Sequence, residues 1–129
     1  MTFDRLQRYS PHLLALLRII AALLFIEHGT QKLFNFPAAP GMPVPLFTLF
    51  GIGAILELVG GILILIGWFT RPVAFILAGE MAVGYFLVHA PGSFFPAVNM
   101  GDAAILFCFI FLYLVTSGPG AFSVDGSRR

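Results

Sequence analysis

Charged residues are scarce in this sequence: Asp, Glu, Lys and Arg make up 10% of its 129 residues, whereas 59% are hydrophobic. The mean hydropathy of +0.97 lies outside the range of soluble globular domains. The seven basic residues are scattered along the chain instead of clustering, which speaks against a nucleic-acid-binding surface. The composition therefore predicts an integral membrane protein whose main partner is the lipid bilayer, with no nucleic-acid partner.

Cysteine is also nearly absent. The sequence contains one, Cys108, which excludes an intramolecular disulfide and every redox motif built from two cysteines. Phosphate-binding loops, soluble catalytic motifs and metal-ligand spacings are missing, and no metal site is predicted. Any redox chemistry would require a bound cofactor, and the sequence leaves open whether the protein is an enzyme.

Apolar runs occupy most of the chain, at residues 13–34, 46–69, 72–89 and 102–117. At about 1.5 Å per residue in a helix, the first two runs easily cross a hydrocarbon core of about 30 Å, and the third just does. The fourth run needs a thinner bilayer or help from flanking residues. We therefore expect an all-α fold in which residues 1–129 form one domain, an integral membrane bundle of four transmembrane helices.

Basic residues outside the apolar runs indicate how the chain is oriented. They are Arg5, Arg8, Arg71, Arg128 and Arg129. These positions precede the first run, separate the second from the third, and end the chain, whereas the connections at 35–45 and 90–100 carry no charge. By the positive-inside rule, both termini face the cytoplasm.

Proline marks two further features. Ser10 followed by Pro11 predicts an N-cap and the first residue of the first helix. The first uncharged connection contains Pro37, Pro40, Pro43 and Pro45. Proline fixes φ and removes an amide donor, so we expect an extended and fairly stiff loop there.

Ionisable residues inside the predicted spans are the candidates for function. Those at depth are Arg18, Glu27, Glu57 and Glu80. A polar layer nearer the outer side contains His28, Lys32, His89, Asn99 and Asp102. A charged group at a helix centre costs roughly 2.5–3.5 kcal/mol on insertion scales, so such groups must be paired, protonated or solvated. Depths counted from the helical rise place Arg18 within reach of Glu80.

Each candidate has a plainer interpretation. Glu57 and Glu80 either handle protons or a ligand, or they are protonated carboxyls that hydrogen-bond a neighbouring backbone carbonyl. Arg18 could form an ion pair, and both it and Lys32 could extend toward the headgroups. A histidine pair on two helices could ligate haem, but interfacial histidines more often pack and hydrogen-bond, so haem is not expected.

The helices predicted at 13–34 and 46–69 are called helix 1 and helix 2 here. Helix 1 carries two polar stripes. Arg18, Gly29 and Lys32 share one, while Glu27 and Gln31 lie close to the opposite one. Neither stripe suits a lipid-facing surface, so helix 1 is either wedged centrally or covered by a second copy of the chain, and we favour a homo-oligomer. In helix 2, a stripe of Gly53, Glu57 and Gly61 predicts close approach of another helix.

Segments distributed along the chain resemble the DoxX family of small bacterial inner-membrane proteins. In order they read RIIAALLFIEHGTQKLF, LELVGGILILIGWFTRPVA, NMGDAAILF and GPGAFSVD. Asp102 stands where the family usually has Glu. The resemblance implies a four-helix bundle in the bacterial inner (plasma) membrane. It also implies a link to a redox partner protein, because the family is named for similarity to a subunit associated with a thiosulfate:quinone or quinol oxidase system.

Several functions remain open. The first is a redox-associated membrane subunit that binds a quinone or another amphipathic ligand, with His28 and Lys32 at the outer rim of a polar intramembrane pocket. The walls expected for that pocket are Phe25, Phe34, Phe94 and Phe95. The alternatives are a structural or assembly module of a membrane complex, and a small proton-coupled transporter with the buried glutamates as relay sites. The broken helices and repeats of transporters are not evident.

Overall fold

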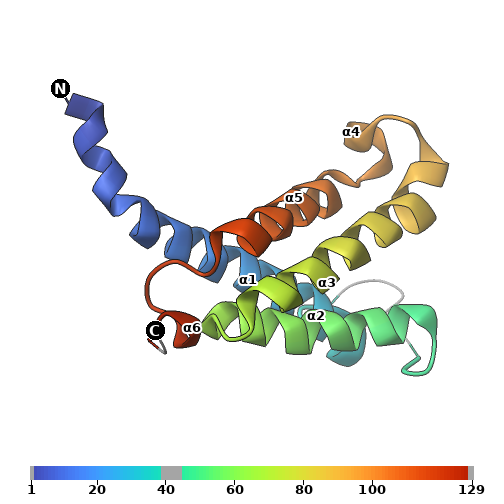
Figure 1. Cartoon of the computed structure of the whole chain (residues 1–129). Coiled ribbons are helices and arrows are strands. Elements are labelled where there is room, and N and C mark those ends of the chain that lie inside the picture. Colours follow the sequence, from blue (N-terminus) through green and yellow to red (C-terminus); the bar gives the residue numbers. More distant parts are fainter. Residues whose placement is uncertain (1, 39–44, 128–129) are drawn as a thin grey trace.

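The structure, a computed structural model, describes residues 2–38 and 45–127, and these residues are helical apart from short turns and connections. The main helices are α1 (Ser10–Phe34), α2 (Leu49–Ile66), α3 (Thr70–Gly84) and α5 (Asp102–Ser117). Shorter helical pieces are the 3-10 helix Thr2–Tyr9, the π-helical turn Tyr85–His89, the 3-10 turn Ala90–Gly92, α4 (Pro96–Asn99) and α6 (Val124–Ser127). The expected all-α fold is confirmed (Figure 1).

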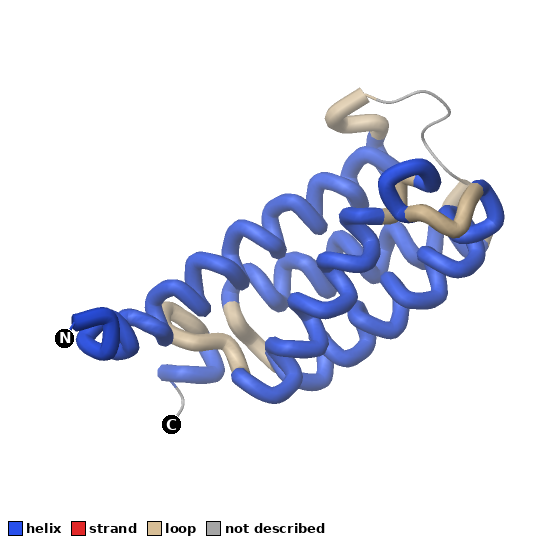
Figure 2. Tube along the Cα trace, turned by 90° about the horizontal axis from the view of Figure 1, so that it is seen from above, coloured by secondary structure: helices blue, strands red, loops and turns tan. Residues whose placement is uncertain are grey.

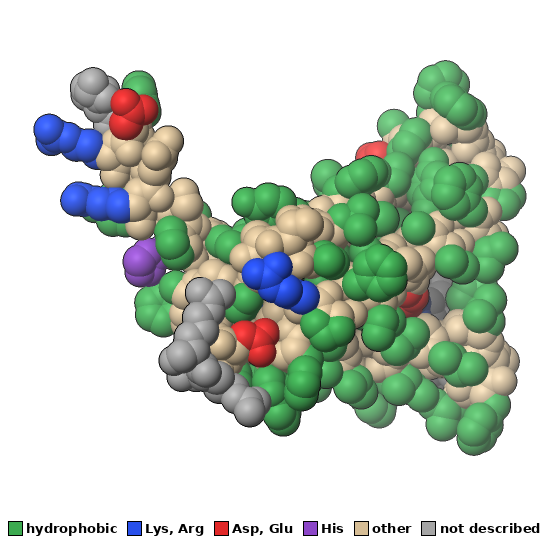
Figure 3. All heavy atoms as spheres, in the orientation of Figure 1, with side chains coloured by type: hydrophobic (Ala, Val, Ile, Leu, Met, Phe, Trp, Pro, Cys, Tyr) green, Lys and Arg blue, Asp and Glu red, His purple; other side chains and the backbone are tan. Residues whose placement is uncertain are grey.

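Length and composition make this a helical membrane protein. The continuous helical segments Phe3–Phe34, Leu49–Ile66 and Thr70–Gly92 are each long and apolar enough to cross a membrane. The fourth apolar helix, Asp102–Ser117, is shorter, with 16 residues. Large apolar side chains are exposed along all these helices, and they spread over the face shown in Figure 3. Such a surface suits contact with lipid tails.

The helices pack as two pairs. α1 runs along α2, and α3 runs along α5. A short turn between α2 and α3 connects the two pairs, and these two helices also contact each other. α1 and α5 touch only slightly. Toward the end away from the termini, α3 and α5 diverge from α1 and α2 (Figure 1). The two pairs are therefore in closest contact near the end where the chain begins and ends.

The core between the pairs contains an aromatic cluster. The Phe25 ring meets the rings of Phe107 and Phe111 edge-on, with centroids 5.4 and 5.0 Å apart. All three side chains are buried, together with small and aliphatic residues of α1, α2, α3 and α5. Edge-to-face ring pairs add attraction beyond simple burial. This cluster fixes α5 against α1 at the few places where they touch.

The C-terminal segment, residues 118–127, folds back onto the end of the bundle where α1 begins and α2 ends. The amide of Ala121 donates to the carbonyl of Pro11 at 3.0 Å, and the amide of Asp125 donates to the carbonyl of Gly67 at 2.9 Å. The Asp125 carboxylate accepts from the amides of Phe69 and Thr70 at 3.0 and 2.9 Å. These bonds satisfy free amides at the start of α3, so the segment caps that helix and ties it to α1.

Helix ends depart from expectation in one respect. Ser10 begins α1 but does not cap it, because the 3-10 helix Thr2–Tyr9 runs directly into the first turn. A side-chain cap occurs instead at α2, where Thr48 Oγ1 accepts from the Gly51 amide at 3.2 Å. Pro40 and Pro43, on which the stiff-loop prediction partly rests, lie outside the described residues.

Gly29 sets the closest approach of α1 and α2. A Cβ atom there would lie 2.9 Å from the Leu58 nitrogen and 3.0 Å from the Ala54 oxygen, both backbone atoms that cannot move aside. We therefore expect Gly29→Ala to destabilise the protein by about 1–3 kcal/mol, the usual cost of overpacking. Thermal unfolding in detergent measures this.

Gly79→Ala is the matched control for that substitution. Nothing lies within 4 Å of the Cβ it would add to α3. Alanine has the better helix propensity, by up to about 1 kcal/mol, so this variant should be unchanged or more stable. Equal unfolding temperatures for the two variants would contradict a tight crossing at Gly29.

Candidate functional site

A cleft of about 430 Å³ opens between the two helix pairs where they diverge. Its walls are apolar, as in most ligand sites, with side chains that include Leu49, Phe50, Met81, Leu87, Met100 and Phe107. Its polar lining residues are His28, Lys32, Glu57, Glu80 and His89. The cleft therefore combines a greasy wall with a small group of ionisable side chains.

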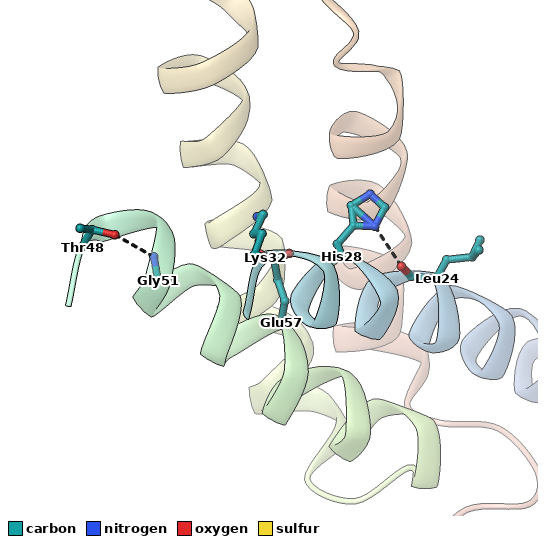
Figure 4. Close-up of polar contacts among 6 residues, drawn as sticks. All are labelled: Leu24, His28, Lys32, Thr48, Gly51 and Glu57. Carbon is teal, nitrogen blue, oxygen red and sulfur yellow. Dashed lines mark hydrogen bonds and ion pairs between the residues drawn. The ribbon is translucent and has the colours of Figure 1, made fainter. Parts of the chain in front are cut away.

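Two of these polar side chains form an ion pair. Glu57 of α2 is 1% exposed, and its Oε2 lies 2.7 Å from the Lys32 Nζ of α1 (Figure 4). The close crossing at Gly29 brings the two helix backbones together one turn before Lys32. The Lys32 ammonium group donates a short, charge-assisted hydrogen bond to the Glu57 carboxylate, so each charge has a partner.

Glu80 of α3 brings a second carboxyl group to the same place. Both carboxyl groups line the cleft, and two carboxyl groups that meet can share a hydrogen bond only when one of them carries a proton. A Cβ on Gly53 would lie 3.1 Å from Glu80 Oε2 and 3.7 Å from Glu57 Oε2. Gly53 therefore leaves the space in which the two carboxyl groups meet.

One oxygen of this carboxyl pair finds no partner among the described residues. Glu80 Oε1 is buried and accepts no hydrogen bond from any of the described residues. A buried polar atom without a partner is costly, so native structures usually satisfy it with water, an ion or a ligand. This oxygen marks the point at which a hydrogen-bond donor would be held.

Two histidines lie further along the cleft. His28 Nδ1 is 3.0 Å from the Leu24 carbonyl (Figure 4), and its ring meets that of Phe107 edge-on. His89 Nδ1 is 3.0 Å from the Asn99 carbonyl. In each ring one nitrogen is committed to the backbone, which fixes its orientation. No cluster of three or more His, Cys, Asp or Glu residues suited to a metal ion occurs within the part of the chain that the structure describes.

Arg18 does not reach Glu80, and that expectation was wrong. Its guanidinium is fully buried and donates to the carbonyls of Ala121 and Phe122 at 3.1 and 2.9 Å. It also donates to the carbonyl of Pro119 and, at 3.4 Å, to that of Leu65. The C-terminal segment lies closer to Arg18 than α3 does, so the arginine binds backbone oxygens and holds the tail.

Glu27 and Asp102 also lie away from the cleft. Both side chains are exposed, and neither is among the lining residues. The structure thus brings together His28, Lys32, Glu57, Glu80 and His89, and leaves the other candidates elsewhere.

The expected aromatic walls were wrong as well. Phe25 belongs to the buried core, and the others, Phe34, Phe94 and Phe95, are exposed and do not line the cleft. Phe50 and Phe107 take their place. Neither has a polar neighbour in the sequence that would have singled it out.

Gly53 also has a role that the sequence analysis missed. The glycine pattern predicts a packing residue there, but its position one turn before Glu57 is a signal of the space between the two carboxyl groups.

Comparisons with known proteins give a consistent picture. The family model described as DoxX matches residues 13–90. An uncharacterized protein of Haemophilus influenzae is 43% identical over 132 residues, covering 95% of each chain. The inner membrane protein YphA of Escherichia coli is 32% identical over 89% of each chain. The inner membrane protein YqjF of the same organism is 34% identical over 84% of this chain and 85% of its own. No solved structure matches the chain significantly.

Proposed function

This chain is a multi-pass inner-membrane protein that belongs to the DoxX family, and we propose that it binds a quinone, or an amphipathic ligand built like one, in the cleft between α1, α2, α3 and α5. In this proposal it serves as a membrane subunit of a redox system and works with a redox partner protein. The observation that carries the proposal is the buried Glu80 oxygen, which has no partner among the described residues and lies in an apolar cleft that the half-buried Lys32 also lines.

The chemistry of the lining residues fits such a ligand. A quinone has an apolar tail for the cleft walls and a ring carbonyl that can accept a hydrogen bond from Lys32. Its reduced form, a quinol, has a hydroxyl that can donate to Glu80 Oε1. Oxidation of a quinol to a quinone releases two protons and two electrons. The carboxyl pair of Glu57 and Glu80 can accept one proton, and an imidazole that also lines the cleft, that of His28 or His89, can accept the other. The two electrons pass to an acceptor on the partner protein.

Topology is part of the same proposal. We place four helices across the bilayer with both termini in the cytoplasm, and we expect the chain to act as a homo-oligomer. In support, both ends of the chain lie at one end of the bundle (Figure 1). Arg71 lies close to that end, in the first turn of α3. A periplasmic reporter that is active when fused to the C-terminus would contradict this orientation.

Glu80→Gln is expected to weaken quinol binding about tenfold, because the amide accepts a weaker hydrogen bond than a carboxylate and cannot share a proton with Glu57. Binding is measured by fluorescence quenching of the purified protein with a short-tailed benzoquinol. Glu27→Gln makes the same chemical change on the same scaffold at an exposed carboxyl outside the cleft. This control should bind the quinol as the native protein does.

A second candidate function is a structural or assembly module. It is favoured by the Lys32–Glu57 pair, because an internally satisfied pair also fixes the register of α1 on α2. The same variants separate the two functions. If the native protein binds neither quinone nor quinol, and Glu80→Gln lowers only the yield or the integrity of the complex, the ligand proposal is wrong and the assembly function is favoured.

A further inference from the structure

Glu27 and Gln31 are left unexplained by the cleft. Gly29 of α1 faces α2 at van der Waals distance, and residues two positions before and after it lie roughly 160° around the helix. Glu27 is exposed, and Gln31 is partly exposed. Within the described ranges, no hydrogen bond or ion pair involves either side chain. Two polar groups therefore lie on a side of α1 that would otherwise meet lipid, where they are costly.

The same side of α1 carries a regular apolar pattern. Its positions alternate in steps of four and three residues: Leu13, Leu17, Ile20, Leu24, Glu27, Gln31 and Phe34. We call this set the α1 seam. Its apolar members are between 41% and 65% exposed. Spacing that averages 3.5 residues over three heptads is the pattern of a helix that packs against another helix in a coiled coil. Other side chains of α1, such as Leu16 and Leu23, are also apolar and exposed. What distinguishes the seam is that it also carries Glu27 and Gln31.

We propose that the α1 seam binds the α1 seam of a second copy of this chain, forming a parallel, two-fold symmetric dimer. Two copies inserted in the same orientation meet with their helices parallel, so equal positions along the seam face each other. Gln31 and the partner's Glu27 then lie one helical turn, about 6 Å, apart along the seam, a step that their long side chains can span. A Gln31 amide can therefore donate to the partner's Glu27 carboxyl, and the symmetric bond forms in return. Each copy therefore offers the hydrogen-bond donor and the acceptor that the other copy lacks. This complementarity argues for self-association over binding to an unrelated partner.

The position of α1 in the bundle permits this contact. α1, which continues from the N-terminus, lies along one edge of the molecule (Figure 2), and it packs along α2. His28 and Lys32 line the cleft from other sides of α1, so a dimer at the seam leaves the cleft open. The polar pair sits near one end of the seam, where polar residues at core positions set register and partner number. The dimer proposal stands independently of any ligand.

Cross-linking in native membranes tests the seam. In a Cys108→Ala background, Ile20→Cys is compared with Ile76→Cys, which replaces the same residue type on α3 at similar exposure, 54% against 48%. With a lipid-soluble oxidant, we expect a disulfide-linked dimer from Ile20→Cys and at least tenfold less from Ile76→Cys. Equal dimer from both positions, or none from Ile20→Cys, overturns the proposal.

A second measurement does not depend on engineered cysteines. Native mass spectrometry of the wild-type chain should show dimers, and Gln31→Leu should weaken dimerisation about tenfold, because two symmetric hydrogen bonds are lost from the interface. Wild-type protein that is monomeric at every concentration overturns the proposal. So does a Gln31→Leu protein that dimerises as strongly as wild type.

Discussion

Replacing Arg18 with methionine should detach the C-terminal segment and destabilise the protein by about 3–5 kcal/mol, the range expected when a buried charged group with several partners is lost. The guanidinium is fully buried and holds backbone oxygens of Leu65, Pro119, Ala121 and Phe122. Methionine fills a similar volume but donates no hydrogen bond. Carbonyls that remained buried would therefore lack a hydrogen-bond donor. Release of the C-terminal segment from the bundle would let water hydrogen-bond to them, so the released state becomes more favourable.

Limited proteolysis measures that release directly. Cleavage within residues 118–127 should become much faster in Arg18→Met, because protease sites open when local structure is lost. Arg71→Met is the matched control. Arg71 is exposed and donates to the carbonyls of Val115 and Thr116 at 3.0 and 2.6 Å, so its loss should cost only about 1 kcal/mol. Equal protease sensitivity of the two variants would show that Arg18 does not hold the tail.

The helices of this fold could be read largely from the sequence. Because an apolar chain in lipid must satisfy its backbone internally, long apolar runs become helices. α5 occupies the run 102–117 from end to end. α2 is shorter than the run 46–69 because Thr48 caps its start, and Gly67, with φ of 70°, ends it in the left-handed region. Ends therefore follow capping chemistry, which hydropathy does not register.

The candidate site was only partly readable, for a physical reason. The cost of ionisable groups in lipid predicts that Lys32, Glu57 and Glu80 are functional candidates, and the structure brings these three together. The same argument could not place Arg18, because its partners are backbone carbonyls, which every residue carries. The apolar lining was also unreadable, because side chains facing lipid, core and cleft are equally hydrophobic in sequence.

Replacing Lys32 with methionine should have the other large effect, a loss of about 3 kcal/mol in the free energy of unfolding. The substitution leaves the Glu57 carboxylate, 1% exposed, without its cation. The expected loss is at the lower end for broken buried pairs because the Lys32 side chain is 25% exposed and its charge is partly solvated. Thermal and denaturant unfolding in detergent measure it.

The double variant Lys32→Met/Glu57→Met then separates stability from ligand binding. Removing both charges of a buried pair is often neutral for stability, so the double variant should recover most of what Lys32→Met loses. If the charges serve a ligand, this double variant should still fail to bind the quinol although its stability is restored, because Glu80 has lost its lysine and carboxyl neighbours. A double variant that is stable and binds the quinol as tightly as wild type would instead limit the pair to holding α1 against α2. A fold that does not recover would mean that the charges specify the helix packing itself.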